Sequence, residues 1–157
     1  MGSIRGATPA DLDTLSSPIA ALPLMRRYGN DAGTLAKIWR EALVRGDRIY
    51  VACGNQGPCG LCWFMPSGTL GVGGYLRLIA LTPEAQGTGI GAELLETFER
   101  ETFVHSKNAF LLVSDFNTAA QRFYERQGYV RTGALADLVV PGVSELLYWK
   151  KRPATPP

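Results

Sequence analysis

The sequence predicts one α/β domain, and three observations lead to that class. The chain has 157 residues, a length that suits one ordinary domain with a single core. Hydrophobic residues make up 46% and charged residues 19%, which excludes a disordered or fibrous protein. Apolar residues recur at helical spacing in some segments and as alternating or continuous short runs in others. The predicted order is β-α-α-β-β-β-α-β-α-β-β over residues 1–152, and residues 153–157 are expected to be a disordered tail.

Helix signals dominate the first part of the chain after a short initial strand. The run Thr8-Pro9-Ala10-Asp11 is typical of a helix start, because Thr8 can cap free N–H groups and Pro9 suits the first helical position. Pro18 and Pro23 predict that this first helical region is kinked or split. A second helix is expected to open at Asn30-Asp31 and to close at Gly46.

Strand signals follow. Residues 48–53 and 60–65 are expected to form a hairpin around the turn at 55–58. Residues 67–74 are rich in glycine and predict a connecting loop, and residues 75–81 predict a long apolar strand. This second stretch therefore supplies three strands in sequence.

The remaining third alternates helices and strands. Residues 89–104 predict a helix with one apolar face, and the apolar run 109–113 predicts a strand covered on both faces. A further helix is expected to begin at Asn117 and to turn Ala120, Phe123 and Tyr124 inward. Two last strands are predicted, at 129–132 and 146–149.

Composition and charge exclude several classes of function. Sixteen Lys and Arg against fourteen Asp and Glu give a net charge of +2, too balanced to indicate a nucleic-acid or anionic-membrane partner. The stretch between Arg48 and Arg77 has no charge, but its many glycines exclude a spanning helix. Residues 1–14 lack the pattern of a signal peptide, so a cytoplasmic location is expected.

The three cysteines do not indicate a metal centre. Cys59 and Cys62 have C-x-x-C spacing, but the chain has no second such pair and its one histidine, His105, is far away in sequence. We interpret the cysteines as small buried hydrophobic residues. No metal is expected.

One glycine-rich segment carries the clearest chemical signal. The strand ending at Leu81 runs into Gln86-Gly87-Thr88-Gly89-Ile90-Gly91, and a helix begins at once. Glycine allows close backbone approach to a ligand, and the free N–H groups of a helix start bind phosphate oxygens. The segment therefore predicts a pyrophosphate site. It lacks the lysine of a nucleotide P-loop and the spacing of a dinucleotide fingerprint.

Two motifs together resemble the GNAT family of N-acetyltransferases. The glycine segment is similar to that family's acetyl-CoA signature, Gln/Arg-x-x-Gly-x-Gly/Ala. Residues 117–129, Asn-Thr-Ala-Ala-Gln-Arg-Phe-Tyr-Glu-Arg-Gln-Gly-Tyr, are similar to its second signature, Asn-x-x-Ala-x-x-aromatic-Tyr-x-x-x-Gly-aromatic. The close match covers about residues 78–132. The resemblance implies an acyl-CoA N-acyltransferase fold, with a single mixed, mostly antiparallel sheet splayed at its centre and helices on both faces.

The resemblance also implies roles for individual residues. Leu81 and Thr82 would end the strand that pairs with the pantetheine arm, and the N–H of Leu81 would polarise the thioester carbonyl. Asn117 would hydrogen-bond acetyl-CoA near the pantetheine, and Tyr124 would be the general acid at the thioester sulfur. The pyrophosphate would be held by the backbone amides of Gln86, Gly87, Thr88, Gly89, Ile90, Gly91 and Ala92.

Several assignments stay open at this stage. Residues 75–81 contain no glutamate that could serve as the general base. Glu84 lies on a turn, where a solvated charge is the favoured interpretation, and the sequence does not rank the carboxylates of Glu41, Asp47, Asp115 and Glu145. Arg122 and Arg126 could meet the 3′-phosphate of coenzyme A or could be solvated helix charges. The candidates for an aromatic acceptor pocket are Tyr28, Trp39, Trp63, Tyr75 and Trp149.

The expected function is direct acetyl transfer from acetyl-CoA, as co-substrate, to a primary amine of a small molecule or peptide. The alternatives are a non-catalytic acyl-CoA-binding or sensing domain, and transfer of a longer acyl group. No Cys-His or Ser-His arrangement predicts a covalent acyl-enzyme. The last strand could pair with a second copy in a homodimer. Neither the acceptor amine nor the oligomeric state follows from the sequence.

Overall fold

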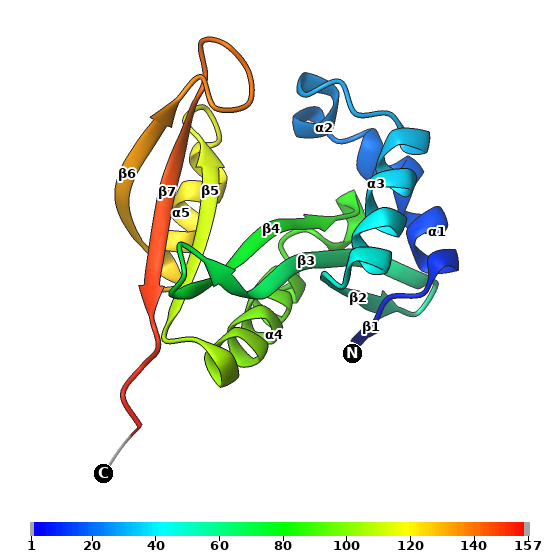
Figure 1. Cartoon of the computed structure of the whole chain (residues 1–157). Coiled ribbons are helices and arrows are strands. Elements are labelled where there is room, and N and C mark those ends of the chain that lie inside the picture. The colour runs from blue at the N-terminus through cyan, green and yellow to red at the C-terminus, as the bar shows by residue number, and fades with distance from the viewer. Residues whose placement is uncertain (1, 156–157) are drawn as a thin grey trace. The chain divides into compact units, whose positions relative to one another are not determined.

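The computed structural model describes residues 2–155 (Figure 1). The predicted element order is confirmed, with one extra short helix and one 3₁₀ turn. Of the predicted tail, residues 153–155 form no helix or strand, and residues 156–157 lie outside the described residues. The elements are β1 (Ser3–Gly6), α1 (Pro9–Ala20), α2 (Pro23–Arg27), α3 (Ala32–Arg45), β2 (Arg48–Gly54), β3 (Gly57–Thr69), β4 (Gly73–Leu81), η1 (Pro83–Ala85), α4 (Ile90–His105), β5 (Asn108–Ser114), α5 (Thr118–Arg126), β6 (Val130–Ala136) and β7 (Ser144–Lys151).

The strands form one mixed sheet of seven in the order β1-β2-β3-β4-β5-β7-β6. β4 and β5 are parallel neighbours, whereas the pairs β1–β2, β2–β3, β5–β7 and β6–β7 are antiparallel. The parallel ladder is short: it runs from Gly73 opposite Asn108 to Leu76 opposite Leu111. By contrast, β5 and β7 pair over seven residues. The prediction of a mixed, mostly antiparallel sheet is confirmed.

The chain divides into two compact units. The first comprises residues 1–64 and 78–98, and the second comprises residues 65–77 and 99–157. In the first unit, α1 and α3 pack on one face of the strands, where Trp39 and Leu12 share a core cluster with Leu61. Phe64 lies on the other face and meets Phe98 of α4 edge-on, with ring centroids 5.2 Å apart. Helices therefore cover both faces of the sheet in this unit.

The helix boundaries in the first unit follow the predicted capping residues. The Thr8 hydroxyl accepts from the Asp11 backbone, and the Asp11 carboxylate accepts in return from the Thr8 N–H at 2.8 Å, which is a capping box. Asp31 caps α3, and Gly46 ends it in the left-handed conformation. Pro23 begins the separate helix α2, which confirms the predicted split.

In the second unit, β7 is the strand that connects the other elements. The buried Tyr148 donates its hydroxyl to Glu125 Oε1 on α5 at 2.9 Å. Lys150 Nζ lies 2.9 Å from Glu99 Oε1 on α4, and both side chains are largely buried. These contacts attach α5 and the C-terminal part of α4 to the same face of β7. β6 is the edge strand, and every residue of it is exposed.

Three details of the sequence interpretation are wrong. Residues 67–74 are mostly strand, because β3 extends to Thr69 and β4 begins at Gly73. The run 109–113 is not buried on both faces: its odd-numbered residues are buried, and its even-numbered residues are half-buried. The helix α5 has no buried residue, so Phe123 is not a core side chain. The glycine content of residues 67–74 predicted more loop than is present, and the apolar composition of the other two segments predicted more burial than the packing provides.

A steric constraint at the start of β4 gives a testable prediction. A Cβ at Gly74 would lie 2.6 Å from Thr102 Cγ2 and 2.9 Å from the Pro66 carbonyl oxygen, both in the second unit. We expect Gly74→Ala to lower the free energy of unfolding by about 1–3 kcal/mol through overpacking. Gly133→Ala is the matched control, since a Cβ there meets no atom within 4 Å, and it should change stability by less than about 0.5 kcal/mol. Equal midpoints of denaturant unfolding for the two variants would contradict the close contacts that a Cβ at Gly74 is expected to make.

Candidate functional site

The glycine turn between β4 and α4 has a backbone that requires glycine at two positions. Gly87 and Gly89 have φ angles of +74° and +92°, in the left-handed region that other residues rarely adopt. A Cβ added at either glycine would meet no protein atom within 4 Å. The turn therefore has an open surface at these two residues, where a ligand could approach the backbone closely.

This turn also presents a row of backbone donors. Among residues 2–155, no hydrogen-bond acceptor is found for the N–H groups of the five residues Gly87–Gly91. The first backbone bonds of α4 are donated by Ala92 and Glu93, both to the Gly89 carbonyl. The helix dipole adds partial positive charge at this end. Successive N–H donors with open space beside them suit the negative oxygens of a pyrophosphate, so the residues present fit the predicted ligand.

Short-range contacts hold the turn in place within the first unit. The Thr82 N–H donates to the Cys59 carbonyl at 2.9 Å, and the Thr88 hydroxyl donates to the Ala85 carbonyl at 2.6 Å. Gln86 Nε2 lies 3.4 Å from the Leu81 carbonyl oxygen. The structure thus brings together Leu81, Thr82 and Gln86–Ala92, which the sequence predicted as one group.

The other two predicted site residues lie on α5 in the second unit. Asn117 caps this helix: its Oδ1 accepts from the Ala120 N–H at 3.2 Å. Its amide nitrogen has no acceptor among the described residues, so it keeps donors for a ligand. Tyr124 is half-buried, and its ring contacts Phe123 and Tyr129 edge-on at centroid distances of 5.0 and 5.8 Å. These aromatic neighbours fix the direction of the Tyr124 phenol.

A buried carboxylate lies at the adjoining ends of β5 and β7. Glu145 is only 6% exposed, and Ser114 directly opposite donates its hydroxyl to the two carboxylate oxygens at 3.2 and 3.3 Å. Tyr75 lies on the same side of these strands, and burial raises the pKa of its phenol. Arg77 opposes this rise in pKa, and the Glu145 charge adds to it. The Tyr75 hydroxyl is therefore a neutral donor at physiological pH.

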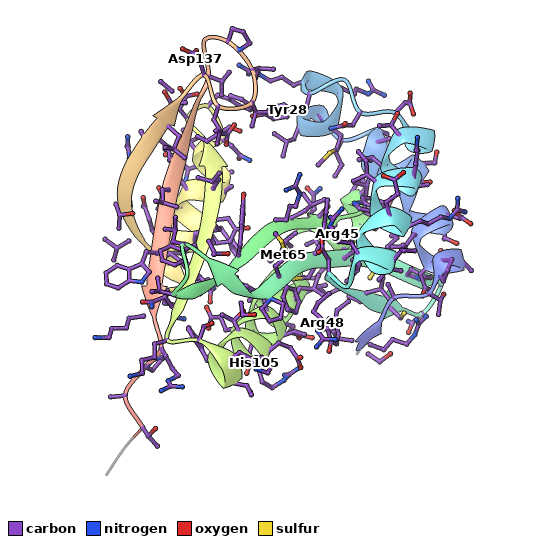
Figure 2. The ribbon with its side chains drawn as sticks, in the orientation of Figure 1. Tyr28, Arg45, Arg48, Met65, His105 and Asp137 are labelled. Carbon is purple, nitrogen blue, oxygen red and sulfur yellow. The ribbon has the colours of Figure 1, made fainter. Side chains whose placement is uncertain are left out.

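The other carboxylates left open by the sequence have different environments. Asp47 accepts from the Trp63 indole at 2.8 Å and pairs with Arg45, which lies at the end of α3 (Figure 2). Glu41 and Glu84 are exposed. Asp115 is also exposed and accepts from the Ser144 N–H at 3.0 Å. Glu145 is thus the buried one of the five that bonds a hydroxyl.

Ser114 was missed by the sequence analysis, and Glu145 was left unranked. Their sequence positions are 31 residues apart, and only the register of β5 against β7 brings them together. A polar residue at the end of an apolar strand, directly before the Asn117 motif, is the one sequence signal that could have pointed to Ser114.

Other predicted features have structural roles or stay predictions. Trp39 and Trp63, two of the candidates for an aromatic acceptor pocket, are buried in the core. Cys62 is buried, which raises the pKa of its thiol, and the Cys59 thiol contacts the Ala52 carbonyl. Arg122 and Arg126 are both exposed on α5, so the choice between a phosphate contact and solvation stays open.

Among residues 2–155, no group of three or more His, Cys, Asp or Glu side chains is arranged to hold a metal ion. Within the same residues, every helix is too short or too polar to cross a bilayer.

Comparison with known proteins gives a consistent family relationship. A model of the acetyltransferase (GNAT) domain matches residues 45–131 of the chain. An uncharacterized N-acetyltransferase of Methanocaldococcus jannaschii is 35% identical over 82 residues, which are 51% of this chain and 53% of that protein. The match thus spans about half the length of this curated relative.

Solved structures share the fold at low sequence identity. Ard1 from Thermoplasma volcanium matches with a TM-score of 0.78 at 20% identity, covering 98% of this chain and 99% of that one. An aminoglycoside 6′-N-acetyltransferase complexed with coenzyme A matches with a TM-score of 0.76 at 15% identity and 99% coverage of both chains. These structures establish the acyl-CoA N-acyltransferase fold.

Proposed function

Because the chain belongs to the GNAT family of acetyltransferases, we propose that it transfers an acetyl group from acetyl-CoA directly to a primary amine. The observation that carries this proposal is the row of five N–H groups at Gly87–Gly91 without acceptors in the described chain. A tight strand-to-helix turn does not need two left-handed glycines facing open space, whereas a backbone cradle for phosphate oxygens does.

Acetyl-CoA would be held by groups from both motifs. The backbone from Gln86 to Ala92 would bind its pyrophosphate. Leu81 and Thr82 would pair with its pantetheine arm as an added strand would, and the Asn117 amide would donate to it. When bound, this co-substrate supplies an acetyl group activated as a thioester.

Two groups of the chain would assist the transfer. The Leu81 N–H would donate to the carbonyl oxygen as negative charge develops on it. The Tyr124 phenol would donate its proton to the departing thiolate. A free phenol has a pKa of about 10 and a thiol such as that of cysteine has one of about 8.5, so the two groups can exchange a proton. The aromatic neighbours of Tyr124 support this role because they limit the positions that the hydroxyl can take.

The proposed function is tested by the release of free coenzyme A from acetyl-CoA in the presence of a panel of primary amines. We expect amine-dependent release, with the acetylated amine detected by mass spectrometry. Binding of acetyl-CoA without release for any amine would instead indicate a sensing domain. Faster turnover with a longer acyl-CoA would indicate that the acyl group is not acetyl.

The pyrophosphate cradle is tested by Gly89→Val. A β-branched side chain at this left-handed position would project into the open space beside the N–H groups, so we expect a rise of at least tenfold in the dissociation constant of acetyl-CoA, measured by calorimetry. Gly46→Val is the matched control, because Gly46 is also left-handed and open but ends α3. The Gly46→Val variant should lower the free energy of unfolding by a similar amount and leave the affinity for acetyl-CoA unchanged. An unchanged affinity in a folded Gly89→Val variant would exclude the cradle.

The general acid is tested by Tyr124→Phe. This variant keeps the ring and its contacts with Phe123 and Tyr129 but removes the proton. General acid catalysis contributes about 10²–10⁴-fold, so kcat should fall on that scale while acetyl-CoA binding stays near the parental value. The measurement requires an amine whose chemical step is rate-limiting. Parental turnover in the variant would mean that Tyr124 only packs and that water supplies the proton.

A further inference from the structure

We propose that Gln121 and Glu125 are positioning residues that set the rotation of α5 about its axis and thereby aim the Tyr124 phenol. Gln121 acts through the end of β5, and Glu125 acts through Tyr148 of β7. The proposal rests on the proposed role of Tyr124 in acetyl transfer. It adds two residues whose identity the Asn117 motif leaves unspecified.

The first support is that α5 is not held by a buried apolar face. Helices of small domains are usually fixed by burying a stripe of apolar side chains, but none of the nine residues of α5 is buried. Its two aromatic side chains, Phe123 and Tyr124, are only half-buried. Directional polar contacts therefore have to supply much of what fixes the orientation of this helix within its unit.

The second support is a stripe of polar side chains with a spacing of four residues. Asn117, Gln121 and Glu125 follow one another at this spacing, so they lie along one side of the helix. Gln121 Nε2 donates to the Asp115 carbonyl at 3.0 Å and to the Ser114 carbonyl at 3.3 Å. These two carbonyls belong to the last residue of β5 and the residue after it. The N-terminal half of α5 is thus tied to the end of β5.

The third support is another contact on the same stripe, one helical turn further along. Tyr148 is fully buried on β7 and donates its hydroxyl to Glu125 Oε1 at 2.9 Å. Burial raises the pKa of the Tyr148 phenol, and the bond to Glu125 adds to that rise, whereas Arg131 opposes it. The phenol therefore stays protonated at physiological pH, and it can keep donating to the carboxylate.

Two contacts on one stripe limit the rotation of the helix more than either contact alone. Successive helical residues are about 100° apart around the axis, so fixing Glu125 also fixes the direction of its neighbour Tyr124. The surface of a helix lies about 5–6 Å from its axis, so a rotation of about 10° displaces a group there by roughly 1 Å. A misplacement of that size can lower a rate by about 10²-fold. Gln121 and Glu125 can thus affect proton transfer through Tyr124.

Tyr148→Phe tests the contact because it removes only the donor hydroxyl. With an amine whose chemical step is rate-limiting, we expect kcat to fall by about ten- to a hundredfold. The dissociation constant of acetyl-CoA should stay near the parental value, because the proposed pyrophosphate cradle lies in the other unit. Glu125→Met removes the acceptor from an exposed position and should give the same loss without a change in the core. Glu125→Gln should keep most of the activity, since its amide oxygen still accepts.

A double-mutant comparison separates positioning from a merely structural role. If Glu125 acts through Tyr124, adding Glu125→Met to Tyr124→Phe should change kcat by less than about twofold. Gln121→Met removes the amide donors at a similar side-chain length, and its effect on kcat should likewise depend on Tyr124. An equal loss of kcat with and without the Tyr124 hydroxyl would overturn the proposal, because the contacts would then act on another group.

Thr132→Val is the matched control. It removes a hydroxyl that donates to the Leu147 carbonyl of β7 at 3.2 Å, so the same strand loses a hydrogen bond that does not involve α5. We expect a parental kcat, and the melting temperature establishes that each variant is folded.

The outcomes distinguish this proposal from the function on which it rests. Absence of turnover in the parental protein with every amine would overturn the proposed acetyl transfer and the positioning role with it. A parental kcat in Glu125→Met beside a slow Tyr124→Phe variant would overturn the positioning role alone.

Discussion

The parallel pairing of β4 with β5 is the constraint on which the site chemistry depends. Parallel neighbours need a crossover of a dozen or more residues, usually with a helix, and residues 82–107 supply it through η1 and α4. The crossover must leave the end of β4 and reverse direction before the helix begins. The left-handed glycines make that reversal, and the same residues leave the first N–H groups of α4 available for phosphate oxygens. Chain direction and anion binding thus depend on the same few residues.

A second constraint operates in the antiparallel ladder of β5 and β7. Because side chains alternate along a strand, this ladder presents two different surfaces. One surface carries Tyr148, whose bond to Glu125 fixes the helix that bears Tyr124. The opposite surface carries the Ser114–Glu145 pair. The two faces of this ladder therefore carry different polar contacts, one to a helix and one within the sheet.

The sequence predicted the features that depend on local chemistry. Thr8, Asp31 and Gly46 act as caps because capping needs only residues a few positions apart. The glycine turn is also local, so its residues and its donor groups could be predicted together. Features that depend on contacts between residues far apart in the sequence could not be predicted in this way. The partial burial of Phe123 depends on how α5 packs, and the contact of Glu145 with Ser114 depends on the β5–β7 register.

The contrast between Asp47 and Glu145 shows how two buried carboxylates reach their contacts by different routes. Asp47 accepts from the Trp63 indole and pairs with the Arg45 guanidinium at the end of α3. Glu145 accepts from the Ser114 hydroxyl directly opposite it on β5. Arg45 and Asp47 are two positions apart in the sequence, so their pairing is a local feature. Ser114 and Glu145 are 31 positions apart, and only the register of two strands from separate parts of the chain brings them together, so that contact could not be predicted from neighbouring residues.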